Sequence, residues 1–352
     1  MEDIDRKSGN EKKWGILVHL GRNMWGDLRA NKKVTFDMEC WNNVVDKCVE
    51  CGMNTIVIDV GEGVQYKSHP ELSVEGAWSE EQVKAEVQRL RKLGISLIPK
   101  LNFSATHDAW LGIYERMVST PEYYKVCREL IHEVYDMFDQ PEAIHIGMDE
   151  ENWKHVTNDL TAEGETSIST VRHNALLVHD INYLAECVKE KGAKCHMWHD
   201  PFTNMKEKYS DDIDRDILPY VWMYYSYLKE NWTLISEQSE EVKDFYANEF
   251  ARRYGYTIEY VEESPSVLQA ISLLEKMFEE KRPFLLTTSN LYIDNCDVDA
   301  IEFVRRNNPD FSLLAGMITA PWGAMIPKGN ELKMKAIELV GKAKKIYEAA
   351  VK

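Results

Sequence analysis

The sequence predicts a single-domain α/β protein, a TIM barrel of the (β/α)8 type. Short apolar segments bounded by turn or charged residues recur eight times, and amphipathic helical patterns lie between them. The segments are continuously apolar, which indicates strands buried on both faces of a parallel sheet. Eight such units in 352 residues fit a barrel with insertions. An open doubly wound sheet is the alternative, but no glycine-rich phosphate loop follows the first strand.

The eight predicted strands share an apolar centre and a glycine, proline or charged residue near an edge. They are 14–21 (WGILVHLG), 54–61 (NTIVIDVG), 94–103 (GISLIPKLNF), 143–148 (AIHIGM), 194–200 (KCHMWHD), 217–225 (ILPYVWMYY), 283–289 (PFLLTTS) and 311–322 (FSLLAGMITAPW). Because a parallel strand is followed by a crossover helix, the barrel predicts a helix after each of them.

Helix boundary signals support the same organisation. The clearest helix begins after Ser79, which can form a capping box with Gln82, and Gly94 is placed to end it. Another helix is expected over residues 37–51, and a third begins after Pro121. Each carries an apolar stripe at a spacing of three and four residues, which is typical of a helix packed on a sheet.

The domain organisation follows from these patterns. We expect a polar tail over residues 1–13 and one barrel over residues 14–352. The longest connection, at about 226–282, is expected to add helices to the barrel. The seven cysteines fall mostly within the predicted elements, where free thiols pack as small apolar groups.

Composition limits the partners. The net charge of −17, with Lys and Arg scattered along the chain, argues against nucleic acid or an anionic membrane surface. No apolar run approaches the roughly 20 residues that span a bilayer, and no signal-peptide segment is visible. We therefore expect the chain as given to be cytoplasmic, or exported if a signal was removed from it. The sequence gives no indication of oligomeric state.

Chemically functional side chains gather where the predicted strands end, which is where a barrel of this type builds its active site. The acids at these ends are Asp59, Glu62, Asp149, Glu150, Glu151, Asp200 and Asp294. The other candidates are Arg22, His107, Trp198, Trp222, Tyr224, Tyr292 and Trp322. Sugars offer apolar C–H faces to aromatic rings and hydroxyl groups to carboxylates, so this mixture predicts a carbohydrate site. Each residue taken alone is also typical of a helix cap or of the core.

One segment is specific enough to indicate a protein family. The run His145-Ile146-Gly147-Met148-Asp149-Glu150 resembles the His-x-Gly-Gly-Asp-Glu motif that ends the fourth strand in the catalytic domain of glycoside hydrolase family 20, the β-N-acetylhexosaminidases. The likeness continues in order from Trp14 to about Pro327. The segments that carry it are GILVHLGR, the third unit as far as His107, MWHD, VW, LYID and APWG.

The resemblance implies a mechanism. These enzymes retain the anomeric configuration, and the 2-acetamido oxygen of the substrate acts as the nucleophile. By resemblance, Glu150 is the general acid and base, Asp149 orients and stabilises the acetamido group, and Tyr292 hydrogen-bonds its oxygen. The implied sugar-binding residues are Arg22, His107, Trp198, Trp222, Asp294 and Trp322. No metal or cofactor is expected.

Departures from the family pattern imply a changed sugar specificity. Met148 replaces a glycine, His19 replaces an acid of the first strand, and Lys100 and Asn102 replace two acids of the third. The residue expected to hold the sugar O4 and O6 atoms is a glutamate in the family, and here it is Ala324. The residues that could replace it are Asp200, Glu62, Glu151 and Tyr224.

Three other functions stay open at this point. The barrel could bind glycans without cleaving them, or it could use Glu151 or Asp200 as a conventional second carboxylate. A metal-dependent enzyme is a third hypothesis, because His196, His199 and Asp200 lie close in the sequence and His145 lies one strand away. Neighbouring positions on a strand face opposite sides, so His196 and His199 are poorly spaced for one ion.

Overall fold

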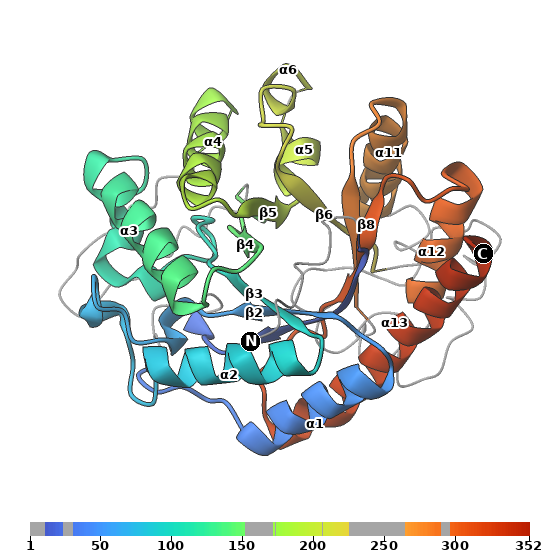
Figure 1. The fold of residues 1–352 in the computed structure, drawn as a ribbon. Helices are drawn as coiled ribbons and strands as arrows, with labels where there is room; N and C mark the ends of the chain where they lie inside the picture. The colour runs from blue at the N-terminus through green and yellow to red at the C-terminus, as the bar shows by residue number, and fades with distance from the viewer. Residues whose placement is uncertain are drawn as a thin grey trace.

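The computed structural model describes residues 11–23, 31–151, 172, 174–205, 207–224, 265–289 and 296–352. Within these ranges eight parallel strands close into a barrel in sequence order, and helices surround it (Figure 1). The strands are β1 Lys13–His19, β2 Thr55–Asp59, β3 Ser96–Lys100, β4 Ala143–His145, β5 Lys194–Trp198, β6 Leu218–Trp222, β7 Phe284–Thr288 and β8 Leu314–Thr319. The predicted barrel is confirmed, and closure rules out the open sheet.

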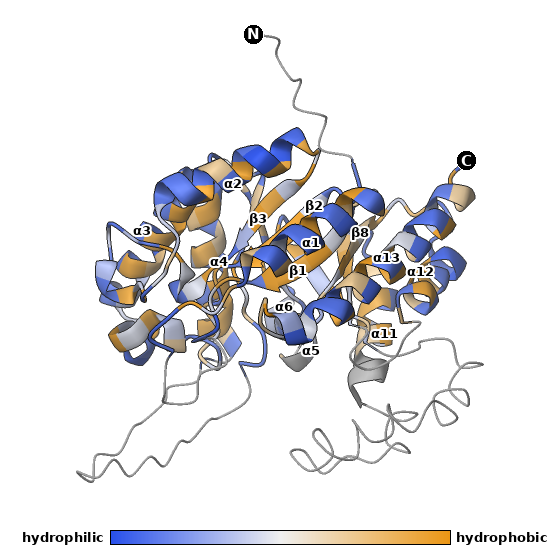
Figure 2. Cartoon of the chain, turned by 90° about the horizontal axis from the view of Figure 1, so that it is seen from below, coloured by the Kyte–Doolittle hydropathy of each residue, from blue (hydrophilic) through white to orange (hydrophobic). Residues whose placement is uncertain are grey.

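The helices cover the outer face of the barrel. Those in the described ranges are α1 Met38–Glu50, α2 Glu80–Lys92, α3 Pro121–Met137, α4 Asn174–Glu190, α5 Asp200–Asn204, α6 Glu207–Ser210, α11 Pro265–Glu279, α12 Cys296–Asn307 and α13 Asn330–Ala350. In the described connections lie four 3₁₀ segments: Gly61–Gly63, Pro70–Leu72, Ala109–Met117 and Pro327–Gly329. Figure 2 shows that the helices around the barrel carry both apolar and polar residues, as an amphipathic covering layer requires.

Local signals explain where the helices begin. Ser79 and Gln82 form the predicted capping box at the start of α2, and Gly94 follows the helix with a φ of +76°. Asp37 caps α1 by accepting a hydrogen bond from the backbone N–H of Cys40 at 2.8 Å. These caps satisfy backbone donors that have no partner within the helix.

The barrel interior is arranged in layers by the register of the strands. The lower layer is apolar and includes Leu17, Val57, Ile98 and Ala143. Two residues further along the first four strands, the register pairs His19 with Asp59, Asp59 with Lys100, and Lys100 with His145. Because side chains of one layer point the same way, the polar layer lies inside the barrel, beneath the strand ends. The interior is therefore polar on the side where the active site was predicted.

The structure bears on two expectations about domain organisation, the start of the barrel and the long connection. Lys13 belongs to β1 and pairs with Glu142 across 2.7 Å, while the Lys12 ammonium donates to the Phe311 carbonyl. The barrel therefore begins before residue 14, because Lys13 pairs in register with Gly316 of β8. In the long connection α11 confirms the expected helix near its end, and residues 225–264 lie outside the described residues.

Two further expectations concern thiols and membranes. Six cysteines are buried and Cys51 is half-buried, and all seven are free. None of the helices in the described ranges combines the length and the apolar character that a bilayer-spanning segment needs.

Candidate active site

The acids of the motif that begins at His145 lie on a loop that leaves the sheet immediately after β4. We call residues 147–151 the acid loop. Its backbone turns sharply, with positive φ angles at Gly147 (74°), Met148 (70°) and Glu150 (53°). Because the chain no longer follows strand geometry, Asp149 and Glu150 need not point to opposite faces. This turn is what lets two neighbouring acids serve one site.

Gly147 gives the loop room to pass β3. A Cβ atom at this position would lie only 2.1 Å from Oδ1 of Asn102, so no larger residue fits without displacing that side chain. The Asn102 amide in turn donates a hydrogen bond to Oδ1 of Asp149 at 2.8 Å. The glycine therefore allows Asn102 to orient the first acid of the pair. Asn102 is one of the departures from the family pattern noted above.

His107 lies beside both acids. Its Nε2 atom is 3.0 Å from Oε2 of Glu150 and 3.4 Å from Oδ2 of Asp149. The Asp149 side chain is buried, whereas 42% of the Glu150 side chain is exposed. One acid is thus fixed within the protein, and its neighbour remains accessible to a ligand.

Asp200 approaches the same loop from the end of β5. Its Oδ1 atom accepts a hydrogen bond from the Glu150 backbone N–H at 3.2 Å, and Oδ2 has no hydrogen-bond partner among the described residues. Burial, and then the nearby charges of Asp149 and Glu150, raise the pKa of Asp200 well above its ordinary value. Burial also lowers the pKa of the adjacent His199 to about 4. Neutral forms of both groups are therefore favoured.

Glu151 lies in a different environment from the other acids of the triplet. Its carboxylate is buried and accepts hydrogen bonds from the guanidinium of Arg172, with Nε at 3.0 Å, and from the backbone N–H of Ala105 at 2.8 Å. The prediction placed Glu151 among the sugar-binding residues. Its contacts instead connect the acid loop with Arg172.

The three predicted tryptophans lie together. The ring of Trp198 is 5.6 Å from that of Trp222 and 5.8 Å from that of Trp322. Tyr224 stacks on Trp222 at 5.7 Å with an interplanar angle of 22°. Trp198 is fully buried and belongs to the interior core, whereas the other two tryptophans are half-buried. Trp198 therefore lies beneath an aromatic wall formed by the other rings.

The polar layer beneath this wall contains a lysine in place of a family acid, and a neighbouring acid pairs with it. The Lys100 ammonium, which stands where the family pattern has an acid, forms a buried ion pair with Asp59 on the neighbouring strand. It also lies 6.0 Å from the Trp198 ring. His19 faces Trp322 with ring centroids 5.7 Å apart. Burial and then the Lys100 charge lower the pKa of His19 well below its ordinary value.

Arg22 and Glu62 meet at the ends of β1 and β2. The Glu62 carboxylate is buried and accepts a hydrogen bond from the backbone N–H of Arg22 at 2.6 Å and from that of Asn23 at 3.0 Å. Burial raises the pKa of Glu62 despite these donors. The half-buried Arg22 is thus anchored through its backbone.

The residues of the metal hypothesis do not converge in the described part of the chain. His196 lies in the barrel interior, where its Nδ1 atom is 3.0 Å from the Tyr220 hydroxyl. His199 lies after the end of β5, with its ring 5.3 Å from that of Trp222. Among the described residues, no group of three or more histidine, cysteine or acidic side chains could hold a metal ion.

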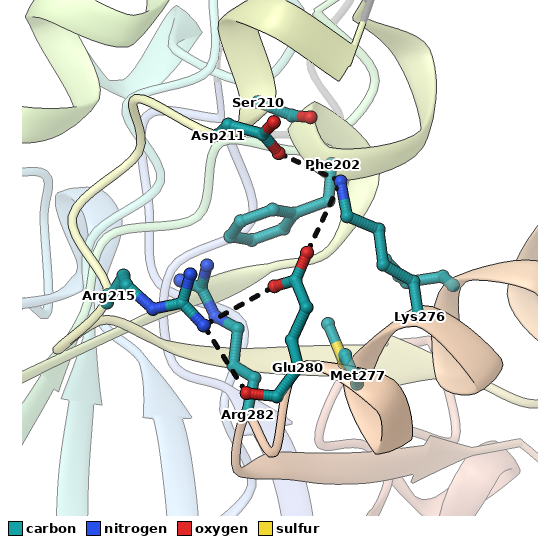
Figure 3. Close-up of a pocket in the computed structure, with 9 residues that line it drawn as sticks. Phe202, Ser210, Asp211, Arg215, Lys276, Met277, Glu280 and Arg282 are labelled. Carbon is teal, nitrogen blue, oxygen red and sulfur yellow. Dashed lines mark hydrogen bonds and ion pairs between the residues drawn. The ribbon is translucent and has the colours of Figure 1, made fainter.

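A separate small pocket lies between α5, α6 and α11 (Figure 3). Lys276 pairs there with Asp211 at 2.9 Å, and the Arg282 guanidinium lies 4.5 Å from the Phe202 ring. Its volume of about 20 Å³ is room for a single water molecule. None of the predicted site residues lines it, so it is not a sugar site.

One comparison with protein families concerns the centre of the chain. Residues 106–242, which include His107, the acid loop, β5 and β6, match the model of the Glycosyl hydrolase family 20, catalytic domain. The chain resembles the catalytic domain of glycoside hydrolase family 20. The match makes the barrel that of a glycoside hydrolase, as the sequence predicted.

Solved structures with this barrel include several family 20 proteins. Dispersin B has 15% sequence identity and a TM-score of 0.54, with 95% of this chain and 98% of that chain covered. A β-N-acetylhexosaminidase from Bacteroides fragilis has 16% identity and a TM-score of 0.53, covering 96% and 71%. A family 20 exo-β-N-acetylglucosaminidase from Vibrio harveyi, in complex with N-acetylglucosamine, has 11% identity and a TM-score of 0.54, covering 96% and 58%. At these identities the likeness concerns the fold. A comparison with curated proteins gives no match.

The structure brings most of the predicted site residues to one end of the barrel, and two fall outside the described residues: Tyr292 and Asp294. Sequence reasoning did not single out Ser104, Thr106 or Arg172. Ser104 donates to the Asp149 carbonyl and Thr106 donates to the Glu150 carbonyl at 2.7 Å. The polar run after β3 was the available signal for the first two, whereas nothing in the local pattern marks Arg172.

Proposed function

We propose that the protein is a retaining, exo-acting glycoside hydrolase of the β-N-acetylhexosaminidase type, and that the 2-acetamido group of its substrate acts as the nucleophile. In this scheme Glu150 protonates the leaving oxygen and then activates water. Asp149 orients the acetamido N–H and stabilises the positively charged oxazolinium intermediate. No carboxylate of the enzyme attacks the anomeric carbon.

The different surroundings of Asp149 and Glu150 carry this proposal. A charge-stabilising group must be held still, and Asp149 is buried against the Asn102 amide. A proton donor must reach the leaving group, and the Glu150 side chain is partly exposed beside His107. The aromatic wall of Trp222 and Trp322 supports a sugar ring as the ligand, because its C–H faces pack on aromatic rings.

Tyr292 and Asp294 complete the proposed site on the sequence resemblance alone. Tyr292 is expected to donate a hydrogen bond to the acetamido oxygen, and Asp294 is expected to bind the sugar. Both lie in the segment between β7 and α12 that is outside the described residues.

We also propose that the site binds the O4 and O6 end of the sugar without the glutamate of the family pattern. In a closed eight-stranded barrel β4 lies across from β8, so a sugar with its anomeric carbon at Glu150 extends towards Trp322 and Ala324. Ala324 has no carboxylate for the O4 and O6 atoms, and Tyr224 lies 6.4 Å from Trp322, ring to ring. Tyr224 is therefore the candidate replacement, and a sugar modified at O4 or O6 is the expected substrate class.

Paired aryl β-glycosides with and without a 2-acetamido group test the proposal. We expect cleavage only of the 2-acetamido compounds. We also expect a thiazoline analogue of the oxazolinium ion to bind far more tightly than substrate, as mimics of high-energy intermediates do. Asp149→Asn should lose turnover and most of the preference for the thiazoline, because the variant lacks the compensating charge.

Two other results would redirect the assignment. Cleavage of glycosides that lack the 2-acetamido group, with indifference to the thiazoline, would point to a conventional second carboxylate such as Asp200. Binding of sugars without any turnover would make the barrel a glycan-binding protein. Cleavage that depends on the 2-acetamido group would justify a search for the preferred glycone.

A further inference from the structure

The acid loop is held by contacts from outside the sheet, because it has left the strand ladder. On one side Ser104 donates to the Asp149 carbonyl and Thr106 donates to the Glu150 carbonyl at 2.7 Å. The last residue of the loop is Glu151. Its Oε2 atom is 3.2 Å from the Ser104 hydroxyl and 2.8 Å from the Ala105 backbone N–H. Glu151 and the two backbone carbonyls therefore share the segment after β3 as their support.

Arg172 also holds the Glu151 carboxylate. It is fully buried, and its Nε and backbone N–H donate to Oε1 of Glu151 at 3.0 and 3.2 Å. Its Nη2 donates to Oε2 of Glu151 at 3.3 Å and to the Phe103 carbonyl at 2.5 Å. The guanidinium also lies 5.8 Å from the Tyr123 ring. A planar fork that bonds both oxygens of a carboxylate fixes its orientation as well as its distance.

Asp180 on α4 anchors the other end of this guanidinium. It accepts a hydrogen bond from Nη1 of Arg172 at 3.2 Å, from the Tyr124 hydroxyl at 2.5 Å and from the Ser119 hydroxyl at 2.6 Å. Burial by itself would raise the pKa of Asp180, but these donors and the Arg172 charge lower it below its ordinary value. The anchor therefore stays charged, and it connects the loop with the helical layer formed by α3 and α4.

We infer that Glu151, through Arg172 and Asp180, is a positioning residue that sets the geometry of the Asp149 and Glu150 carboxylates. This inference deepens the proposed function and rests on it. A buried ion pair contributes little net stability because both charges lose their hydration, but a fully bonded one specifies a single arrangement. Glu151 is adjacent to the proposed general acid, so any shift of its carboxylate moves Glu150 directly.

Glu151→Gln tests the inference, because it keeps the size of the side chain and removes its charge. We expect kcat for an aryl 2-acetamido-β-glycoside to fall about 10- to 100-fold, the scale of a small misplacement of catalytic groups, with KM changed less than about twofold. The matched control is Glu190→Gln. Glu190 also bonds an arginine through both oxygens, with Arg128 Nη1 at 2.5 and 2.6 Å, but this pair is partly exposed and lies between α3 and α4. The control should keep wild-type kinetics.

Hydrogen exchange gives a readout that does not depend on activity. Peptides that cover residues 103–107 and 147–151 should exchange faster in Glu151→Gln than in wild type, and at the wild-type rate in Glu190→Gln. If the wild type cleaves no 2-acetamido glycoside, the proposed function has failed, and this measurement still decides whether Glu151 holds the loop. Unchanged exchange at both segments would overturn the inference.

A second variant keeps the test decisive if Glu151→Gln does not fold. Arg172→Lys retains the buried positive charge but cannot bond both oxygens of Glu151 in one plane. We expect the same fall in kcat with an unchanged KM. A variant that folds with wild-type kcat, or that loses only thermal stability, would reduce Glu151 and Arg172 to structural residues and overturn the inference.

Discussion

Asp200 accepts a hydrogen bond from the backbone N–H of Glu150 across 3.2 Å, so the end of β5 is joined directly to the acid loop. The contact places a buried carboxyl group beside two other acids. Burial and then those charges raise the pKa of Asp200 well above its ordinary value. Protonation at Asp200 relieves the repulsion within the cluster without removing the acceptor for Glu150.

This raised pKa predicts a pH-dependent stability effect of Asp200→Asn. An acid that binds its proton more tightly when folded destabilises the protein as pH rises from its unfolded pKa, about 4, through the folded pKa. Asn keeps an oxygen to accept from Glu150 and cannot ionise. We therefore expect the free energy of unfolding of the variant, relative to wild type, to be greater at about pH 8 than at about pH 5. Urea unfolding at both pH values measures it, and a pH-independent difference would contradict the prediction.

Glu150→Gln tests the proton donor. The amide keeps the volume of the side chain but cannot donate an acidic proton, so turnover of substrates with poor leaving groups should fall by about 10²-fold or more. Activated aryl glycosides, which need less protonation, should lose less. Leaving-group series for variant and wild type measure the difference. A variant within about threefold of wild type on the poor leaving groups would remove Glu150 from the role.

Trp322→Ala separates binding from folding at the aromatic wall. Trp322 is half-buried and its ring lies near those of Trp198 and Tyr224, so we expect KM to rise with a small change in melting temperature. Trp14→Ala is the matched control, because Trp14 lies at the other end of β1 and packs on Tyr347 at 5.4 Å. It should lose about 3–5 kcal/mol of stability, the usual cost for a buried tryptophan, and keep its KM. An unchanged KM in Trp322→Ala would assign this tryptophan to the core.

The fully buried Trp198 gives a different expectation from the other tryptophans. It belongs to the interior core and supports both Trp222 and Trp322. Trp198→Ala should therefore lower the unfolding free energy by about 3–5 kcal/mol and also raise KM, because the wall loses its support. Thermal unfolding and steady-state kinetics on the same preparation measure the two effects. A rise in KM without loss of stability would show that Trp198 contacts the ligand and contributes little to the packing of the core.

Met148 offers a test of backbone strain in the acid loop. It is buried with a φ of +70°, at the position where the family pattern has glycine. Met148→Gly and Met148→Ala both remove most of the side chain, but only glycine adopts this φ without a steric penalty. We expect the Gly variant to be more stable than the Ala variant by up to about 1 kcal/mol, the reverse of the usual order. Chemical unfolding of the two variants measures this, and the ordinary order would show that the loop relaxes.

The sequence by itself determined the barrel and the composition of its mouth. Strand and helix signals are local, so the eight segments, the capping box at Ser79 and the position of the acids after β4 could be predicted from spacing. Because active sites of such barrels form at the strand ends, the sequence also predicted that the three tryptophans lie together. The motif around Asp149 and Glu150 indicated the family resemblance, which the match over residues 106–242 supports.

Only the tertiary structure decided what each polar side chain contacts. Glu151 looked like a third acid of the site, yet its partner Arg172 lies 21 residues further along the chain and gives no local signal. Lys100 looked like a lost acid, and strand register pairs it with Asp59. The physical reason is the same in both cases. A buried charge must find an opposite charge or hydrogen-bond partners, and packing rather than sequence proximity chooses them.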